Sequence, residues 1–193
     1  MTIAIVDYGI GNTFSVAAAL QRLGADITIT SDASIVQQAD RVVIPGVGDA
    51  RAAMNELRLR GLDTVIPLLE QPVLGICLGM QLLCRNSEEG DTQCMGVFDA
   101  DVVRFDGPLK VPHMGWNTIE RTVGPLFRGV DQGTFMYFVH SYHVTRTEMT
   151  VALSDYSGYF SAGLSRRNFF GVQFHPEKSG AAGARLLENF MSL

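Results

Sequence analysis

The chain of 193 residues is predicted to fold as one α/β domain, with a parallel-core mixed sheet flanked by helices. Three observations predict this class. In the first half, short β-branched runs alternate with helix-like segments, as in a parallel sheet with crossover helices. In the second half, strand-like runs follow one another with few helices between them, which predicts extra antiparallel strands. The length suits one domain, residues 1–193, and is short for two.

The first half contains four predicted strands separated by turns and helices. Short apolar runs mark the strands, and apolar residues on one stripe mark the helices. Gly24 is expected to end the first helix, Asp49 to cap the second, and Pro67 to interrupt the third. The predicted strands cover 2–8, 26–30, 41–45 and 72–76, and the predicted helices cover 13–23, 49–58, 62–70 and 78–84.

The second half is predicted to be mainly β structure that ends in a helix over about 180–191. The segment 87–91 is expected to be a solvated acidic loop. No linker, repeat or low-complexity segment divides the chain. The strand-like runs are VVRF, WNTIE, FMYFVHSYHV, TVALSDY, YFSAGLS and FFGVQFH.

The composition favours a soluble protein of the reduced cytoplasm. Hydrophobic residues make up 47% and charged residues 18%, which is an ordinary globular composition. The net charge of -5 and the lack of a Lys/Arg cluster disfavour nucleic acid and anionic membranes as partners. The N-terminus lacks the basic region of a signal peptide, and no apolar run reaches the length of a membrane span. Three cysteines do not suggest a disulfide framework.

Cys77 lies between two glycines where a strand should become a helix. The segment Gly75-Ile76-Cys77-Leu78-Gly79 has the G-x-nucleophile-x-G arrangement of a nucleophile elbow. Such a nucleophile occupies a sparsely allowed backbone conformation, and small neighbours avoid clashes there. The free N–H groups of the following helix favour a thiolate and can bind an oxyanion. The alternative is a buried structural cysteine, which we expect for Cys84, whereas Cys94 is expected in a polar loop.

A thiolate nucleophile needs a base and a group that orients the base. His175 and Glu177 are two residues apart at the end of an apolar strand, and such residues share one side of an extended chain. Pro176 is expected to keep the segment extended. Glu177 would then accept from one ring nitrogen while the other faces the sulfur. A surface turn is the alternative. The remaining histidines lack an acidic residue two positions away: His113, His140 and His143.

A Gly-rich turn over 44–50 follows the third predicted strand. Its backbone N–H groups could face an anion, and in a parallel sheet it lies at the same edge as the elbow. The turn lacks the signature of a phosphate-binding P-loop. The three cysteines contain no C-x-x-C pair, so no metal site and no cofactor are predicted.

The order of Gly-rich turn, G-x-C-x-G and H-P-E resembles the triad-type (class I) glutamine amidotransferases over essentially the whole chain. This resemblance implies a flavodoxin-like α/β fold. Six segments narrow it to the glutaminase subunits of imidazole glycerol phosphate synthase, which acts in histidine biosynthesis. They are DYGIGN (7–12), PGVG (45–48), GICLGMQLL (75–83), PHMGWN (112–117), FVHSYH (138–143) and GVQFHPEKSG (171–180).

The resemblance implies a role for each matching residue. Cys77 would attack the carboxamide of glutamine, and His175, oriented by Glu177, would move the proton to the leaving ammonia. Backbone N–H groups of Val47 and Leu78 would hold the oxyanion, and water would then release glutamate. The implied substrate-binding residues are Gly48, Gln81, His140, Ser141 and Tyr142.

The resemblance also implies a partner, because free ammonia would be lost to water. Similar proteins form a heterodimer with a (β/α)8 barrel cyclase, which activates them and receives the ammonia. The cyclase makes imidazole glycerol phosphate and an aminoimidazole carboxamide ribotide. The expected contact surface comprises Asn12, Trp116, Asn117 and Lys178.

Three other functions remain open at this stage. The chain could be the glutaminase of a different synthase, with the same triad and another partner. It could be a non-catalytic module that docks on and regulates a partner. It could also be a cysteine peptidase or another thiol-dependent hydrolase built on the same elbow.

Overall fold

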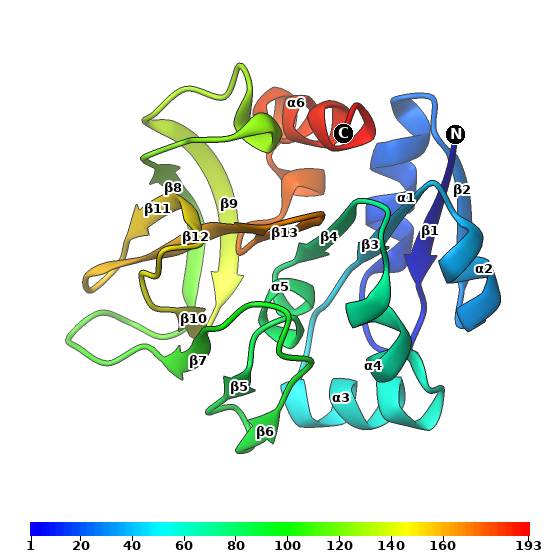
Figure 1. Ribbon diagram of the computed structural model, residues 1–193. Helices are drawn as coiled ribbons and strands as arrows, with labels where there is room; N and C mark the ends of the chain where they lie inside the picture. Colours follow the sequence, from blue (N-terminus) through cyan, green and yellow to red (C-terminus); the bar gives the residue numbers. More distant parts are fainter.

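A seven-stranded sheet lies at the centre of the computed structural model, which describes residues 1–193 (Figure 1). Its strands are β1 (Thr2–Val6), β2 (Asp26–Thr30), β3 (Arg41–Ile44), β4 (Val73–Ile76), β11 (Thr150–Asp155), β12 (Tyr159–Arg166) and β13 (Phe169–Val172). The order β11-β12-β13-β4-β3-β1-β2 runs from left to right in Figure 1. The strands from β13 to β2 pair in parallel, whereas β11 and β12 pair antiparallel. The predicted parallel core with added antiparallel strands is confirmed.

Two smaller sheets complete the second half. One has the order β10-β7-β5-β6, and the other is the antiparallel pair β8-β9. Their strands are β5 (Asn86–Ser87), β6 (Thr92–Gln93), β7 (Asp101–Arg104), β8 (His113–Ile119), β9 (Thr134–His140) and β10 (Tyr142–Val144). The single run FMYFVHSYHV therefore supplies strands to two different sheets, with Ser141 between them.

Helices cover both faces of the central sheet. Alternate residues of β1 point to opposite faces, so Ile3 and Ile5 join one core cluster and Ala4 and Val6 join another. The first cluster includes α1 (Thr13–Arg22) and α6 (Gly180–Met191). The second includes α2 (Ala33–Gln38), α3 (Ala50–Leu59), α4 (Leu62–Val65) and α5 (Leu78–Leu82). Short 3-10 turns are η1 (Ile66–Leu68), η2 (Pro125–Phe127) and η3 (Pro176–Lys178). None of the helices has the length and apolar character needed to cross a membrane.

Several local signals in the sequence act as expected. The side chain of Asp49 accepts a hydrogen bond of 2.8 Å from the backbone N–H of Ala52 and caps α3. Gly24 follows α1 with φ at +86°, a conformation that glycine adopts without steric cost. Pro67 lies within η1, where α4 has already ended.

Three features differ from the sequence-based expectations. Helix α2 was not expected, because its six residues bury only Val36 and form no apolar stripe. The segment 87–91 is not simply a solvated loop, since Ser87 is buried and Glu89 is half-buried. Cys94 is buried in the core cluster rather than exposed in a polar loop. The positions of Glu89 and Cys94 depend on neighbours that are distant in the sequence.

Two glycines allow the turn after β3 to lie directly on the start of α5. A Cβ atom on Gly79 would lie only 1.9 Å from the carbonyl oxygen of Ile44. A Cβ atom on Gly46 would lie 2.6 Å from Cβ of Leu78. Any larger residue would push these two segments apart, so the glycines set their distance.

We expect Gly79→Ala to lower the free energy of unfolding by about 3 kcal/mol, because the methyl group overlaps a backbone atom that cannot move independently. A suitable control is Gly133→Ala, where φ is +83° and no atom lies within 4 Å. That change should cost about 1 kcal/mol through backbone strain alone. Denaturant unfolding of both variants would measure the difference, and equal losses would contradict a packing role for Gly79.

Candidate active site

Cys77 joins β4 to α5 in a conformation that residues with a side chain rarely adopt. Its φ is 53° and its ψ is -111°, and only 6% of its surface is exposed. Such strain persists where the surrounding structure fixes the backbone, and it is frequent at functional sites. The predicted nucleophile-elbow geometry is therefore present, and Cys77 lies at the carboxyl edge of the parallel sheet.

A buried hydrogen bond from Tyr8 fixes the Gly-rich turn after β3. The buried phenol of Tyr8 donates a hydrogen bond of 2.6 Å to the carbonyl of Pro45. Burial and the nearby Cys77 raise the pKa of Tyr8 well above its usual range, so the phenol keeps its proton. Gly48 has φ at +101°, which turns the chain into α3. These contacts place Val47 beside the elbow.

The imidazole of His175 is paired with the carboxylate of Glu177. Nδ1 of His175 and Oε1 of Glu177 are 2.8 Å apart, and both side chains are almost fully buried. The expected extended conformation is wrong, because Pro176 begins the 3-10 turn η3. The fixed φ of proline suits the first position of a helical turn. The turn still brings the two side chains together, so the predicted pairing holds.

His175 also interacts with Cys77. Nε2 of His175 is buried and makes no hydrogen bond of standard geometry. Burial by itself lowers the pKa of His175, but the side chains of Cys77 and Glu177 outweigh it and raise the pKa to about 10. The structure thus brings the thiol, the imidazole and the carboxylate together in the order that nucleophilic catalysis requires.

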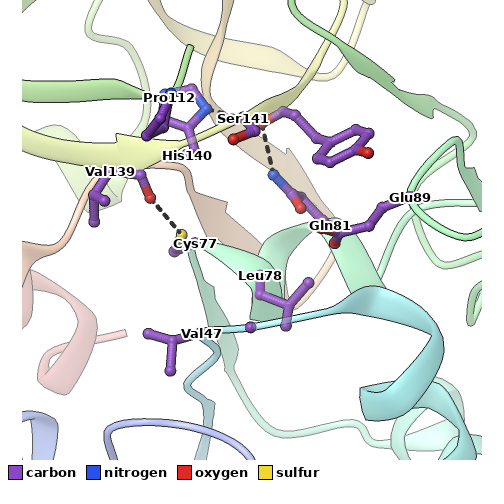
Figure 2. Close-up of a pocket in the computed structure, with 11 residues that line it drawn as sticks. Val47, Cys77, Leu78, Gln81, Glu89, Pro112, Val139, His140 and Ser141 are labelled. Atoms are coloured by element: carbon purple, nitrogen blue, oxygen red, sulfur yellow. Dashed lines mark hydrogen bonds between the residues drawn. The ribbon is translucent and has the colours of Figure 1, made fainter.

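A cavity of about 310 Å³ opens in front of Cys77 (Figure 2). It is lined by Cys77 and all seven other residues predicted to bind the substrate or its oxyanion, which come from three separate segments of the chain. Those seven are Val47, Gly48, Leu78, Gln81, His140, Ser141 and Tyr142. A volume of this size lies at the lower end of the range for small-molecule sites.

Three further residues line the cavity without having been predicted: Glu89, Pro112 and Val139. Oε2 of Glu89 accepts a hydrogen bond of 2.9 Å from the N–H of Ala50 at the start of α3. Burial is the main cause that raises the pKa of Glu89. Its position in SEEGD suggested a surface loop, and nothing in the sequence indicates that this one carboxylate turns inward.

The comparisons with known proteins agree with this geometry. Residues 4–193 match the family model described as "Glutamine amidotransferase class-I". The chain belongs to the class I glutamine amidotransferase family. A relative named imidazole glycerol phosphate synthase subunit HisH, from Bacteroides thetaiotaomicron, is 53% identical and aligns over 100% of both chains. A relative of the same name from Pectobacterium atrosepticum is 50% identical, also over 100% of both chains.

Solved structures share the amidotransferase fold at much lower identity. A glutamine amidotransferase from Thermotoga maritima has a TM-score of 0.67 at 19% identity, covering 100% of this chain and 83% of that one. PurLQS from the same organism has a TM-score of 0.76 at 14% identity, covering 99% of this chain and 97% of the other. At these identities the likeness concerns the fold alone.

One wall of the amidotransferase cavity is held by a row of histidines. Nδ1 of His140 lies 2.8 Å from the carbonyl oxygen of Tyr142, and its Nε2 lies 3.0 Å from Nδ1 of His113. Nε2 of His113 lies 3.3 Å from Nδ2 of Asn117. Burial lowers the pKa of His113 to about 4 and that of His140 to about 3, so both rings are neutral at pH 7.

The hydrogen-bond partners at the two ends of this row, Tyr142 and Asn117, require the same positions for the protons on the two imidazole rings. The Tyr142 carbonyl can only accept, so His140 must carry its proton on Nδ1 and accept at Nε2. At the other end, Oδ1 of Asn117 accepts from the N–H of Thr118, so its Nδ2 must donate to His113. His113 therefore also carries its proton on Nδ1, which it donates to His140.

The predicted partner-contact residues are of two kinds. Trp116 is 56% exposed, and its ring lies edge-on to Tyr137 at 5.9 Å. Nζ of Lys178 lies 5.9 Å from the centre of the same Tyr137 ring. In contrast, the side chain of Asn12 caps α1, and that of Asn117 makes internal hydrogen bonds. A role in partner contact stays a prediction for all four residues.

We expect imidazole nitrogen NMR at neutral pH to find His113 and His140 neutral and protonated on Nδ1. The reason is that a carbonyl acceptor and an amide donor fix the two ends of the row. The variant His113→Gln would assign the two rings. A proton on Nε2 of His140 would contradict the direction deduced for the hydrogen bonds in this row.

We expect Cys77→Ala to lower the pKa of His175 from about 10, because an anionic sulfur stabilises the imidazolium and alanine cannot. Proton NMR of the imidazole across a pH titration would measure the change. Cys84→Ala, which removes a buried thiol elsewhere in the core, is the matched control and should leave that titration unchanged. An unaltered titration of His175 in Cys77→Ala would disprove the interaction between Cys77 and His175.

Proposed function

We propose that this chain is the glutaminase subunit of an imidazole glycerol phosphate synthase. The observation that carries the proposal is the buried pairing of Glu177 with His175 beside Cys77, which itself lines a cavity sized for a small molecule. The relatives that match over the full length carry that subunit's name.

The proposed reaction begins when His175 takes the thiol proton and Cys77 attacks the side-chain carboxamide of glutamine. The oxyanion of the tetrahedral intermediate accepts hydrogen bonds from the N–H groups of Val47 and Leu78. Leu78 is suited to this role because the first N–H groups of α5 have no partner within the helix. Collapse breaks the C–N bond, and His175 delivers its proton to the departing ammonia.

Water completes the proposed cycle. His175 removes a proton from a water molecule that attacks the γ-glutamyl thioester, and the C–S bond breaks to release glutamate and the Cys77 thiolate. Glu177 holds the imidazole through Nδ1, which leaves Nε2 available for each proton transfer. The buried pairing therefore serves both half-reactions.

The cavity walls suit the two ends of glutamine. Nε2 of Gln81 is bonded to the Tyr142 carbonyl and to Gln173, which leaves its Oε1 free to accept from the substrate. We assign Glu89 to the α-amino group, since an ammonium ion gives a half-buried carboxylate an opposite charge. Gly48, His140 and Ser141 line the remaining surface.

We further propose a (β/α)8 barrel cyclase as the partner, in the cytoplasm. The outer face of the β8-β9 pair supports a docking role, because three large side chains on it are more than half exposed. They are Met114, Trp116 and Phe135. An apolar group of this kind, flanked by Lys178, is typical of an interaction surface.

The test uses the complex with a candidate cyclase and its nucleotide substrate. Cys77→Ala should lower glutamine-dependent turnover by at least about a thousandfold, since it removes the nucleophile. Turnover supported by added ammonia should survive, because only ammonia production depends on the thiolate. Leu59→Ala, an exposed position on α3, is a matched surface control and should retain both activities.

Other outcomes would point to the alternative functions. Loss of both activities in an assembled complex would contradict a role confined to ammonia production. Glutamate release that is high alone and unchanged by the cyclase would indicate a different synthase or an independent hydrolase. Absence of glutamate release under every condition would favour a non-catalytic module.

A further inference from the structure

Gln173 is a fully buried polar residue that has no part in the reaction described above. It follows β13 directly and lies two positions before His175. Its Nε2 lies 3.6 Å from Sγ of Cys77, and its Oε1 lies 2.9 Å from Nε2 of Gln81. Nε2 of Gln173 donates its one hydrogen bond to this sulfur. The amide of Gln173 therefore touches the atom that would attack the substrate.

A backbone carbonyl determines which end of the Gln173 amide faces the sulfur. The carbonyl of Tyr142 can only accept, so Gln81 must turn its Nε2 toward it, at 2.9 Å. The second proton on the same Nε2 is donated to Gln173, which must accept it with Oε1. The NH₂ group of Gln173 is then left to face Cys77. The orientation follows from the contacts and does not depend on which amide atom is labelled nitrogen.

Besides His175, the sulfur has two polar neighbours, and these two favour opposite protonation states of Cys77. The carbonyl of Val139 lies 3.8 Å from Sγ and can only accept, so it binds the neutral thiol (Figure 2). The NH₂ group of Gln173 can only donate. A thiol sulfur is a weak acceptor and a thiolate is a strong one, so this bond strengthens when the proton leaves. A donor that binds the charged form more tightly favours that form.

We propose that Gln173 is a further catalytic residue, whose NH₂ group donates to Sγ of Cys77 and stabilises the thiolate before attack. Gln81 is the positioning residue that keeps this donor aimed at the sulfur. When His175 removes the thiol proton, the negative charge stays on the sulfur, and no covalent bond to Gln173 forms or breaks. The inference rests on the proposed function only in that Cys77 is the nucleophile.

The test measures Cys77 itself and needs no glutamine turnover. The full-length protein is alkylated with iodoacetamide between about pH 6 and about pH 9, and the Cys77 peptide is followed by mass spectrometry. In Gln173→Met, which keeps the length but removes the donor, alkylation at neutral pH should slow by about tenfold. The difference in alkylation rate between this variant and the parent should narrow as the pH rises, because the thiol then ionises without the Gln173 donor. Loss of access to Cys77 would slow alkylation equally at every pH.

Gln173→Glu is the second variant, in case the methionine variant does not fold. Glutamate has nearly the same shape and can still accept from Gln81, but an ionised carboxylate cannot donate to the sulfur. It should slow alkylation at least as much as Gln173→Met does. The matched control is Gln93→Met, at the exposed position of strand β6, which should react as the parent does.

Equal alkylation rates in the parent and in either folded variant would overturn the proposal, even if glutamine turnover fell. A failure of the proposed function looks different, since it would appear as glutamate release that survives Cys77→Ala. The two outcomes are therefore measured separately.

Discussion

The active site depends on one backbone constraint, the strained conformation of Cys77 between β4 and α5. A residue with a side chain holds φ at 53° only where its surroundings leave no alternative. Here the surroundings are the parallel strands on one side and the Gly-rich turn on the other, in contact through Gly46 and Gly79. The same close approach brings Val47 next to the elbow. The strain at Cys77 and the position of Val47 therefore arise from a single packing arrangement.

Backbone carbonyls organise the polar side chains of the site. The carbonyl of Tyr142 accepts from both His140 and Gln81, and these two bonds fix the donors and acceptors of every residue beyond them. One branch runs through His113 to Asn117 on the β8 strand, and the other runs through Gln173 to the sulfur. A side chain can flip its amide or change its tautomer, but a carbonyl cannot become a donor. This asymmetry gives the buried network one arrangement of protons.

The sequence was most informative where the chemistry depends on neighbours in the chain. Cys77 was recognisable because glycines flank it, and Glu177 because it lies two positions from His175. His175 and Glu177 meet through the 3-10 turn that Pro176 begins, and not through the extended segment that their spacing predicts. Residues separated in sequence were harder to place. Glu89 looked like part of a solvated loop, and the segment 33–38 shows no apolar stripe that would predict α2.

The sequence by itself determined the α/β class and the parallel core, and it pointed to Cys77, His175 and Glu177 as the proposed catalytic residues, because periodicity and short spacings record those features locally. The tertiary structure alone decided which carboxylate enters the cavity and which face of β8 carries Trp116 outward and Asn117 inward. It also decided that a buried glutamine touches the sulfur. Nε2 of Gln173 and Sγ of Cys77 are 3.6 Å apart. The two residues follow the neighbouring parallel strands β13 and β4, which are far apart in the sequence. No local pattern encodes such a contact, because it exists only once β13 has paired with β4.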